Sequence, residues 1–570
     1  MKSSQSERAA VRRIWGSLDP FLESGPVLGR RVANTRFLAA LLAADPFEEY
    51  HFFLGDREQR ASLAAHLGRL FPGTAEKCRV LDRRELPARL AGEPYHCFHQ
   101  SDCIQFQPVL ARVRNAFSPS MFPITGVTHS LSYANYAEAF LRHLWTGTSQ
   151  RDCIVCTSGP GRAAVEEYFR QLRAGYDLGP EFGQPTLRRV PLGVDAGEIT
   201  PATPEQRAAL RAELDLDPAR TVHLVFGRLS HQSKMDLLPL LRAFQRCFQD
   251  SGGAAKGSAN GPRPGNTTLV LAGWLDEGDA FPATLERLAT NIGLDLRIVA
   301  RPGERKKLAL YRAADVFISI ADNPQETFGL TVLEAAAAGL AAVVSEYDGY
   351  RDLVLDGETG LLVPTLGPDQ SERLDLMAPL LFDNQYHLLL AQRTAVEVPA
   401  LAKALARLHN DPDLRARMGR AARARVERCY TWATVMEEYL ALWDELWTLP
   451  APPRAGQGEW GGGVHPSQVA YASTFAGYAS RNLADGIRLR LGRTGEATYH
   501  HKDAPLIYPG LGGLVEEEGI RRLLFMARRP ATTLELQDGL LAAGLCAGPE
   551  QARALLLWAV KHDLLEVEPA

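Results

Sequence analysis

Short apolar runs alternate with longer amphipathic stretches along most of this chain, and the alternation occurs twice. Strands that alternate with helices form βαβ units on parallel sheets. Helices should cover both sides of each sheet, because runs such as TLVLAG are apolar on both faces. The runs are HFFL (51–54), FPITGVTH (122–129), CIVCTS (153–158), VHLVFG (222–227), TLVLAG (268–273), LRIVA (296–300), VFISI (316–320) and AAVVS (341–345).

The two rounds predict an α/β protein with two Rossmann-like domains. The first round runs to about residue 189, and the second starts near residue 221. Between them, VPLGVDAGEITPATPEQ (190–206) is rich in Pro, Gly and Thr, which favours a hinge over a core segment. We place the domain boundary between residues 195 and 196, with the second domain reaching residue 431. The Gly-rich stretch 250–266 predicts a surface loop.

Composition excludes several classes of protein. A chain of 570 residues is too long for one core. Its 63 Lys and Arg balance 67 Asp and Glu, so no overall basic field attracts nucleic acid or anionic lipid. No apolar run approaches the roughly 20 residues of a membrane-spanning helix. The first residues lack the apolar core of a secretory signal, and eight cysteines indicate no disulfide framework. We therefore expect a cytoplasmic protein.

A linker rich in Pro and Gly (450–464) separates a last module, 465–570. Residues 486–508 alternate in period two around 493–495, which predicts a β-hairpin. Helices are expected over 516–526, 533–543 and 550–562, followed by LLEVE. This pattern is typical of a small α+β domain of the winged-helix kind. With 11 Lys and Arg against 12 Asp and Glu, the module lacks the basic face that DNA binding needs.

The segment NPQETFGLTVLEAAAAG (323–339) carries the strongest functional signal. A helix that begins at about Leu330 directs free N–H groups and its positive dipole end at its own start, where a phosphate fits. Gly329 lets the backbone approach closely. Glu334 can accept hydrogen bonds from vicinal hydroxyls such as those of a ribose, and Glu326 can face a second polyol. The alternative is two solvated carboxylates at an ordinary helix start.

A second segment, FGRLSHQSKMDLL (226–238), supplies two cations. Arg228 follows the Gly that closes a strand, and Lys234 precedes the next helix. In an open α/β sheet, ligands bind outside the carboxyl ends of the strands, so both cations are expected there. Together they predict a site for a diphosphate, unless they are merely solvated surface charges.

These motifs, in order, resemble the family 4 retaining glycosyltransferases of the GT-B fold. GRLS-x3-K is followed by AGW, by LYRAADVFIS, and by NPQETFGLTVLEAAAAGLAAVVSEYDGYRDLVLDGETGLLVPT. VPLGVD (190–195) matches that family's entry into the second domain. The ending LARLHNDPDLRARMGRAARARVERCYTW resembles its closing segment, whose last helix (432–449) returns to the first domain. The resemblance is dense over about 120–450 and absent beyond the linker.

The resemblance implies a nucleotide-diphosphate-sugar donor in a cleft between the two domains, with no metal and no other cofactor. Arg228 and Lys234 would hold the diphosphate and stabilise the leaving charge. Glu326 would contact the transferred sugar, and His129 would contact donor sugar and acceptor. The remaining donor-binding residues would be Arg301, within a base-pocket stretch (300–303), and Phe328, Gly329, Leu330, Thr331 and Glu334. The anomeric configuration would be retained.

One departure from the family concerns its first loop, which usually carries a Gly-Gly turn facing the phosphates. Here the best match is LESGPVLGRRVANTRF (22–37), where Gly25 and Gly29 are separated. We assign a role only to Gly29.

Other chemical readings are weaker. Asp215 and Asp217 have the Asp-x-Asp spacing of a metal-dependent transferase, yet they precede Pro218 at a helix end, where a turn is expected. Cys153 and Cys156 lie in a strand-like run and so face opposite sides. The cluster of His, Cys and Asp between residues 96 and 103 predicts a loop without a metal.

Two rival functions stay open: a related sugar phosphorylase or synthase on the same fold, and a catalytically silent scaffold that acts through its last module. For that module we expect either dimerisation or packing, or recruitment of a peptide or protein acceptor by strand addition.

Overall fold

The computed structural model describes residues 13–22, 29–252, 261–275, 281–451, 469–508 and 510–568. The chain forms two compact units, Met1–Pro466 and Ser467–Ala570. The larger unit contains two parallel sheets, which divide it into a first half and a second half. Gly25 and most of the linker lie outside the described residues, as does much of the Gly-rich stretch 250–266.

The first half is built on a seven-stranded parallel sheet in the order β3-β2-β1-β4-β5-β6-β7. Its strands are β1 (Ile14–Ser17), β2 (Glu49–Leu54), β3 (Cys78–Asp82), β4 (Tyr95–Gln100), β5 (Ile124–Val127), β6 (Asp152–Cys156) and β7 (Thr186–Arg189). Its helices are α1 (Gly29–Ala44), α2 (Arg57–Leu70), α3 (Leu86–Gly92), α4 (Gln107–Phe117), α5 (Tyr136–Leu141) and α6 (Gly159–Tyr176).

The second half is built on a six-stranded parallel sheet in the order β10-β9-β8-β11-β12-β13. Its strands are β8 (Thr221–Arg228), β9 (Thr267–Trp274), β10 (Asp295–Ala300), β11 (Val316–Ser319), β12 (Ala341–Ser345) and β13 (Gly360–Val363). Its helices are α7 (Pro204–Glu213), α8 (Leu238–Gly252), α9 (Phe281–Ile292), α10 (Glu304–Ala313), α11 (Leu330–Ala337), α12 (Tyr350–Leu353), α15 (Val398–Asn410) and α16 (Pro412–Cys429).

A small insertion follows β13. It consists of α13 (Glu372–Leu381) and α14 (Asn384–Ala391), with the two-stranded pair β14 (Thr365–Leu366) and β15 (Ala395–Val396).

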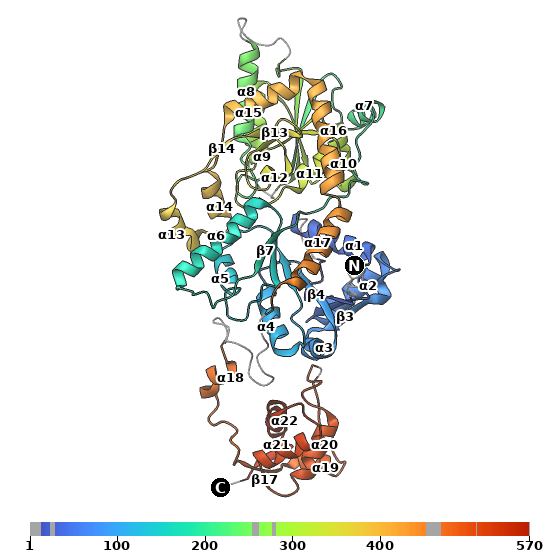
Figure 1. Ribbon diagram of the computed structural model, residues 1–570, viewed down its shortest axis with the longest axis vertical. Helices are drawn as coiled ribbons and strands as arrows, with labels where there is room; N and C mark the ends of the chain where they lie inside the picture. The colour runs from blue at the N-terminus through green and yellow to red at the C-terminus, as the bar shows by residue number, and fades with distance from the viewer. Residues whose placement is uncertain are drawn as a thin grey trace, which may run out of the picture. The chain divides into compact units, whose positions relative to one another are not determined.

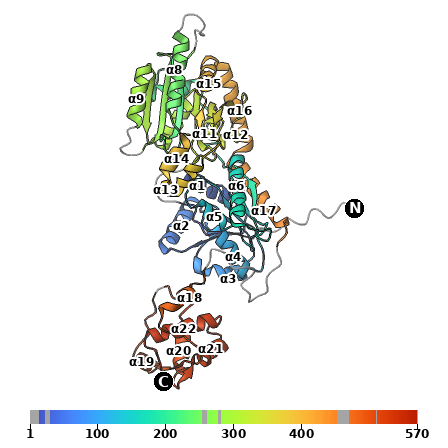
Figure 2. The same ribbon diagram turned by 90° about the vertical axis from the view of Figure 1, so that its left-hand side faces the viewer.

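All eight predicted apolar runs form strands, and the reason is their burial on both faces. Along β9, Leu269 and Leu271 enter one core while Val270 and Ala272 enter another. Helices α8, α9 and α15 supply the first of these cores, and α10 and α11 supply the second. Figure 2 shows α8 and α9 side by side on the sheet. The two-faced apolar pattern thus predicted covered sheets correctly.

The chain crosses between the halves at two adjacent places. Val194 donates its N–H to the carbonyl of Tyr430, 2.8 Å away, and pairs with Thr431. The next helix, α17 (Trp432–Thr448), then lies beside α1 of the first half (Figure 1). Trp443 is fully buried there and donates its indole N–H to Thr125 Oγ1 at 3.1 Å. A single long helix therefore ties the end of the second half to the first sheet.

Two local predictions for this unit were wrong. The segment 190–206 was expected to be a hinge outside the core, yet Leu192, Val194 and Ile199 are buried in the second half. The histidine- and cysteine-rich stretch from residue 96 was expected to be a loop, yet it forms β4, which is buried along its whole length. In both cases the segment packs against apolar neighbours, although its own composition favours an exposed loop.

The smaller unit is an α+β domain with the antiparallel sheet order β17-β16-β18. The predicted helices are present as α20 (Glu517–Met526), α21 (Thr533–Ala542) and α22 (Pro549–Lys561). Its other elements are α18 (Tyr471–Thr474), β16 (Arg488–Leu491), α19 (Arg493–Tyr499), β17 (Ala531–Thr532) and β18 (Leu565–Val567).

The hairpin predicted over 486–508 is wrong, because Arg493–Tyr499 is the helix α19. Strand β16 finds its partners far along the chain, in β17 and β18. Gly495, expected in a turn, packs so closely on the backbone of Leu564 that a Cβ would lie 1.9 Å from its carbonyl oxygen. The winged-helix identity of this unit stays a prediction.

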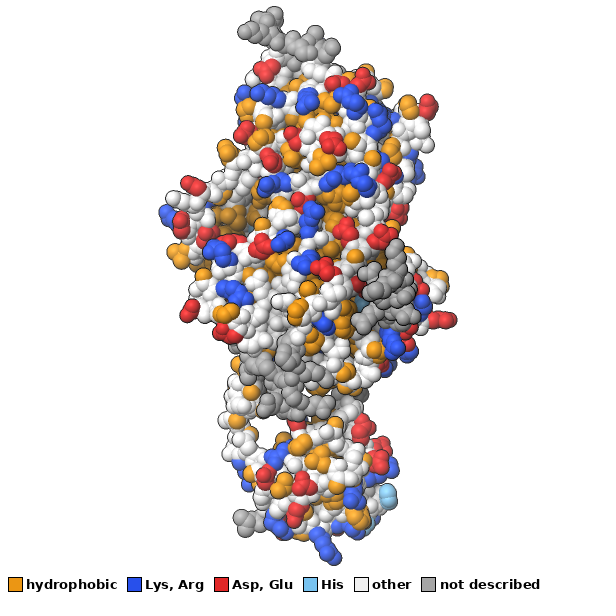
Figure 3. Space-filling view, viewed as in Figure 1, with side chains coloured by type: hydrophobic (Ala, Val, Ile, Leu, Met, Phe, Trp, Pro, Cys, Tyr) orange, Lys and Arg blue, Asp and Glu red, His pale blue; other side chains and the backbone are white. Residues whose placement is uncertain are grey.

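No helix within the described residues is long and apolar enough to cross a membrane. On the face drawn in Figure 3, Lys and Arg side chains are interspersed with Asp and Glu, in keeping with the near-balanced charge of the sequence.

Candidate active site

The predicted cations and carboxylates gather where the second sheet reverses its strand order. Strands β8 and β11 are neighbours, with β9 and β10 on one side and β12 and β13 on the other. Ligands of open α/β sheets bind outside the carboxyl ends of the strands at such a switch point. Arg228 is the last residue of β8, and the loop 320–329 that carries Glu326 follows β11.

Glu326 is the most heavily bonded side chain of this region. The Lys234 ammonium and the Tyr350 hydroxyl, at 3.0 Å, both donate to Oε2. The backbone N–H groups of Thr327 and Phe328 point at Oε1 from 3.3 and 3.4 Å. Burial by itself would raise the pKa of this carboxyl, but the Lys234 charge and these hydrogen bonds together hold the pKa below its ordinary value. Glu326 is therefore ionised at neutral pH.

Helix α11 begins at Leu330, as predicted, behind a glycine that no other residue can replace. Gly329 has a φ of 111°, and a Cβ there would lie 2.6 Å from the ring of Tyr350. The first N–H groups of a helix lack partners within it, so those of Leu330 and Thr331 are available to a ligand. The Thr331 hydroxyl is buried without a hydrogen-bond partner among the described residues. The start of a helix with such groups is a favourable place for an anion.

Glu334 lies in the same helix and is held by two residues that the sequence analysis did not single out. Lys307 donates to Oε1 at 2.5 Å, and the buried hydroxyl of Tyr311 donates to Oε2 at 2.9 Å. Both come from α10, one turn apart, so they reach the same carboxylate. Their i, i+4 spacing indicates that both side chains lie on one face of the helix, but only the fold shows which carboxylate they face.

Two glycines allow close packing at the carboxyl ends of β8 and β9, beside Lys234. Gly273, at the end of β9, has a φ of 142° and passes so close to Gly227 that a Cβ would lie 1.7 Å from its carbonyl oxygen. The Lys234 side chain lies over Gly227, with Cε 3.7 Å from where a Cβ would be. Next to Gly273, Arg301 adopts a φ of 46°, and its guanidinium lies 5.6 Å from the ring centre of Trp274.

The first half presents its own strand ends to this region. His129 follows β5 and donates Nε2–H to the carbonyl of Ser101, 2.9 Å away. The neighbouring Ser130 hydroxyl reaches the carbonyl of Gln325, at 2.8 Å, in the loop that carries Glu326. The structure therefore places His129 next to a residue, Ser130, that contacts the loop carrying Glu326.

Gly29 is the first residue of α1, and a Cβ there would meet no atom within 4 Å. The described structure thus gives no steric reason for a glycine at this position. Beside it, Arg30 pairs with Asp102 at 2.9 Å, and Asp19 accepts the Ser101 N–H at 2.8 Å. Burial, together with the Asp102 charge, raises the pKa of Asp19 to about 6.

Two further carboxyls near Glu326 have raised pKa values: Asp322, which is buried, and Asp348, which is partly buried. Burial raises the pKa of Asp322 to about 7. Burial and the adjacent Glu326 charge raise the pKa of Asp348 to about 8. Because Asp348 is largely protonated at pH 7 and Asp322 about half protonated, the loop region carries less negative charge than its composition indicates.

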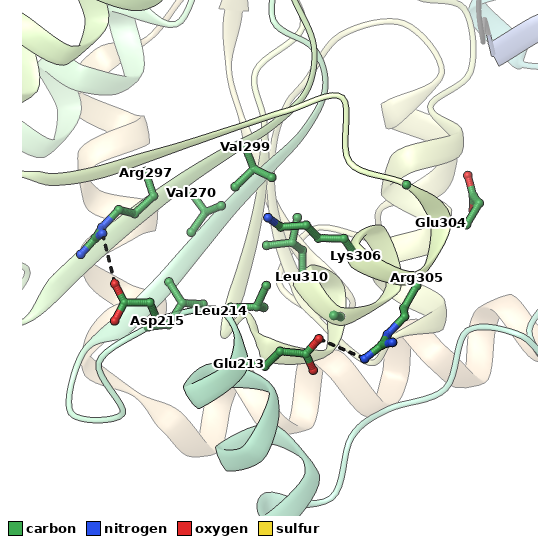
Figure 4. A pocket seen from close by; sticks show the side chains of 13 residues that line it. Glu213, Leu214, Asp215, Val270, Arg297, Val299, Glu304, Arg305, Lys306 and Leu310 are labelled. Carbon is green, nitrogen blue, oxygen red and sulfur yellow. Dashed lines mark hydrogen bonds and ion pairs between the residues drawn. The ribbon is translucent and has the colours of Figure 1, made fainter.

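A pocket of about 580 Å³ lies to one side of these residues, between α7, α10 and β10 (Figure 4). Of the predicted donor-binding stretch, only Gly303 lines it. Arg305 pairs with Glu213 and Arg297 with Asp215 there, as the dashed lines in Figure 4 show. The pocket is therefore not the anion site, and we assign it no role.

The Asp-x-Asp pair lies in the turn that follows α7, as predicted, with Asp217 accepting the Ala219 N–H at 2.9 Å. Among the described residues one group has ligand spacing for a metal: Glu49, His51 and Glu93. It lies at the amino ends of β2 and β4, and Arg79 occupies both oxygens of Glu49 at 2.6 and 2.9 Å. That arrangement is an ion-pair network.

Comparisons with known proteins agree with this fold. Residues 206–387 match the family model described as Glycosyl transferases group 1. A D-inositol 3-phosphate glycosyltransferase of Rhodococcus jostii is 33% identical over 177 residues, which are 31% of this chain and 36% of that protein. The protein of the same name from Saccharomonospora viridis is 30% identical over 278 residues, 48% of this chain and 53% of that protein. The chain thus spans between a third and about half of the length of these relatives.

Among solved structures, Anabaena Alr3699/HepE in complex with UDP superimposes with a TM-score of 0.51. The superposition covers 76% of this chain and all of that one, at 15% sequence identity. The fold of the larger unit is accordingly GT-B, with two Rossmann-like halves, as predicted from the sequence.

Proposed function

We propose that this protein is a glycosyltransferase that moves a sugar from a nucleoside-diphosphate-sugar donor to an acceptor. One observation carries the proposal. At the switch point of the second sheet, an ionised Glu326 bound by Lys234 lies directly before the start of α11, which is followed by Glu334. The sugar, the diphosphate and the ribose of such a donor need these groups in this order.

The proposed donor complex uses each group in one way. The N–H groups of Leu330 and Thr331 and the Thr331 hydroxyl bind the diphosphate, with Arg228 beside them. An ammonium has three donors, so Lys234 can bond to Glu326 and to a phosphate oxygen at once. As the bond to the sugar breaks, negative charge grows on the diphosphate, and preorganised cations stabilise it.

The roles of the other site residues, the independence from metal and the stereochemistry are also part of the proposal. Glu326 binds hydroxyls of the transferred sugar, Glu334 binds the ribose, and Phe328 and Arg301 border the donor. Positive charge from Arg228, Lys234 and α11 takes the part that a divalent cation plays elsewhere, so the reaction needs no metal and no further cofactor. As in the family 4 enzymes, the anomeric configuration is retained, with His129 facing sugar and acceptor.

The test is product formation with a defined donor panel. UDP-glucose, UDP-N-acetylglucosamine and GDP-mannose are incubated with the protein and a bacterial metabolite extract, and mass spectrometry follows the products. The proposal expects nucleoside diphosphate release together with a product heavier by one sugar residue. A product formed only with inorganic phosphate as acceptor would favour a phosphorylase. No release from any donor would favour a silent scaffold.

For Ser467–Ala570 we propose recruitment of a peptide or protein acceptor, rather than of nucleic acid. The support is its small sheet, in which β17 and β18 are both edge strands that an extended peptide can join. Removal of residues 467–570 should leave UDP binding unchanged and raise the acceptor KM at least tenfold. An unchanged acceptor KM would contradict recruitment and favour dimerisation, which the mass of the truncated protein in solution would reveal. A cytoplasmic location remains our prediction.

A further inference from the structure

Two serines of the first half hydrogen-bond to the backbone on either side of Glu326. The Ser130 hydroxyl donates to the carbonyl oxygen of Gln325 at 2.8 Å. The Ser158 hydroxyl donates to the carbonyl oxygen of Thr327 at 2.7 Å. Ser130 and Ser158 follow β5 and β6, which are adjacent in the first sheet. The residue that we place at the transferred sugar is thus held from outside its own half.

Of these two serines, Ser158 is the more deeply buried and makes more than one hydrogen bond. Ser158 has no exposed surface, and its oxygen also accepts the Gly161 N–H at 3.0 Å as the N-cap of α6. A third contact lies beside the pair. His387 donates Nε2–H to the carbonyl of Ser132 at 2.7 Å and accepts from the Gln325 side chain at 2.5 Å.

The second half holds the same loop in a different way. Asn323 donates to the carbonyl of Gln232 at 2.8 Å and accepts the Gln325 N–H at 3.1 Å, which fixes the start of the loop. Lys234 and Tyr350 orient the Glu326 carboxylate itself. The carbonyl oxygens of residues 325 and 327 instead accept hydrogen bonds from the two serines of the first half.

We propose that Ser130 and Ser158 are positioning residues, which set the backbone of Glu326 for sugar transfer when the two halves are in contact. The proposal rests on the function proposed above. Its consequence is a separation of binding from turnover. UDP has no transferred sugar and binds through the second half, so its affinity should not depend on the serines, whereas kcat should.

The experiment compares Ser130→Ala with Ser130→Thr, which keeps the hydroxyl. Ser158→Ala is compared with Thr203→Ala, because Thr203 caps α7 in the same way but is exposed and far from the Glu326 loop in sequence. Each variant is assayed for kcat with the best donor of the panel, for UDP affinity by calorimetry, and for amide hydrogen exchange over residues 323–330.

Loss of one such hydrogen bond should lower kcat about tenfold in each serine-to-alanine variant. The UDP Kd should change less than twofold, and exchange over 323–330 should become faster. Ser130→Thr and Thr203→Ala should match the wild type in all three. A kcat within twofold of wild type, or UDP affinity that falls in step with kcat, would overturn the proposal. If the wild type turns over no donor, the function proposed above is wrong. Unchanged hydrogen exchange in both alanine variants would separately show that the two serines do not hold the loop.

Discussion

The two sheets of the larger unit present different chemistry at their carboxyl ends. The second sheet offers charge to a ligand: Arg228, the Lys234–Glu326 pair, and Glu334 held by Lys307. Toward the Glu326 loop, the first sheet offers neutral groups, namely the hydroxyls of Ser130 and Ser158. Among its own charges, Arg30 and Asp102 pair with each other.

This difference indicates a division of labour within the proposed mechanism. Charges at a switch point bind a charged ligand and stabilise charge that develops during reaction. Neutral hydrogen bonds to a backbone add geometry without changing the local charge. Substitutions of these charges on the second sheet should therefore weaken donor binding, and those at Lys234 and Glu326 should lower turnover as well. Substitutions on the first sheet should lower turnover alone.

The largest effect is expected at the buried ion pair. We expect kcat/KM to fall at least about 100-fold in Glu326→Gln and in Lys234→Met, which keep the shape of each side chain. Each substitution removes one of the charges that stabilise the transition state. Donor turnover measures this, and circular dichroism checks the fold. Lys306→Met, at an exposed lysine of α10, is the matched control and should be silent. Substantial activity in either site variant would show that the reacting centre lies elsewhere.

A smaller effect is expected at the carboxylate assigned to the ribose. Glu334→Gln removes the charge that Lys307 and Tyr311 hold in place. It should weaken UDP binding about tenfold, the usual size of a loss of one charge-assisted hydrogen bond, and leave kcat at saturating donor within threefold. Calorimetry with UDP and with uridine separates the ribose from the phosphates. A variant that binds UDP normally but has lost kcat would place Glu334 at the sugar instead.

The third expected effect is on stability rather than on activity, at the boundary between the halves. Asp348, 3.5 Å from the Ser158 hydroxyl, has its pKa raised to about 8. In the unfolded chain it loses its proton at the ordinary value, so its contribution to the stability of the wild type falls as pH rises from about 4 to about 8. Asp348→Asn carries no such proton. Its Tm relative to wild type should therefore increase steadily between pH 5 and pH 8. A Tm difference that is independent of pH would contradict the assigned shift.

The sequence predicted the parts of the site that are contiguous in the chain. The strand end at Arg228, the helix start at Leu330 and the spacing of Glu326 and Glu334 are local patterns, and each has the expected structure. The alternation of apolar runs likewise predicted both parallel sheets, because each strand is buried on both faces.

Features that depend on distant partners were not predictable in this way. Nothing local to Ser130 or Ser158 indicates a carbonyl 195 or 169 residues away. Likewise, only the fold shows that Lys307 and Tyr311 share Glu334 as a partner. The predicted hairpin failed for the same reason, since the true neighbours of β16 come from residues 531–532 and 565–567.

The central claim is that the second half holds the diphosphate of a nucleotide donor. Calorimetric titration of the wild type and of Arg228→Ala with UDP tests it most directly. The account predicts binding by the wild type and at least tenfold weaker binding by Arg228→Ala, with uridine binding equally to both. Equal UDP affinity in the two proteins would contradict it, and so would the absence of binding of both UDP and GDP to the wild type.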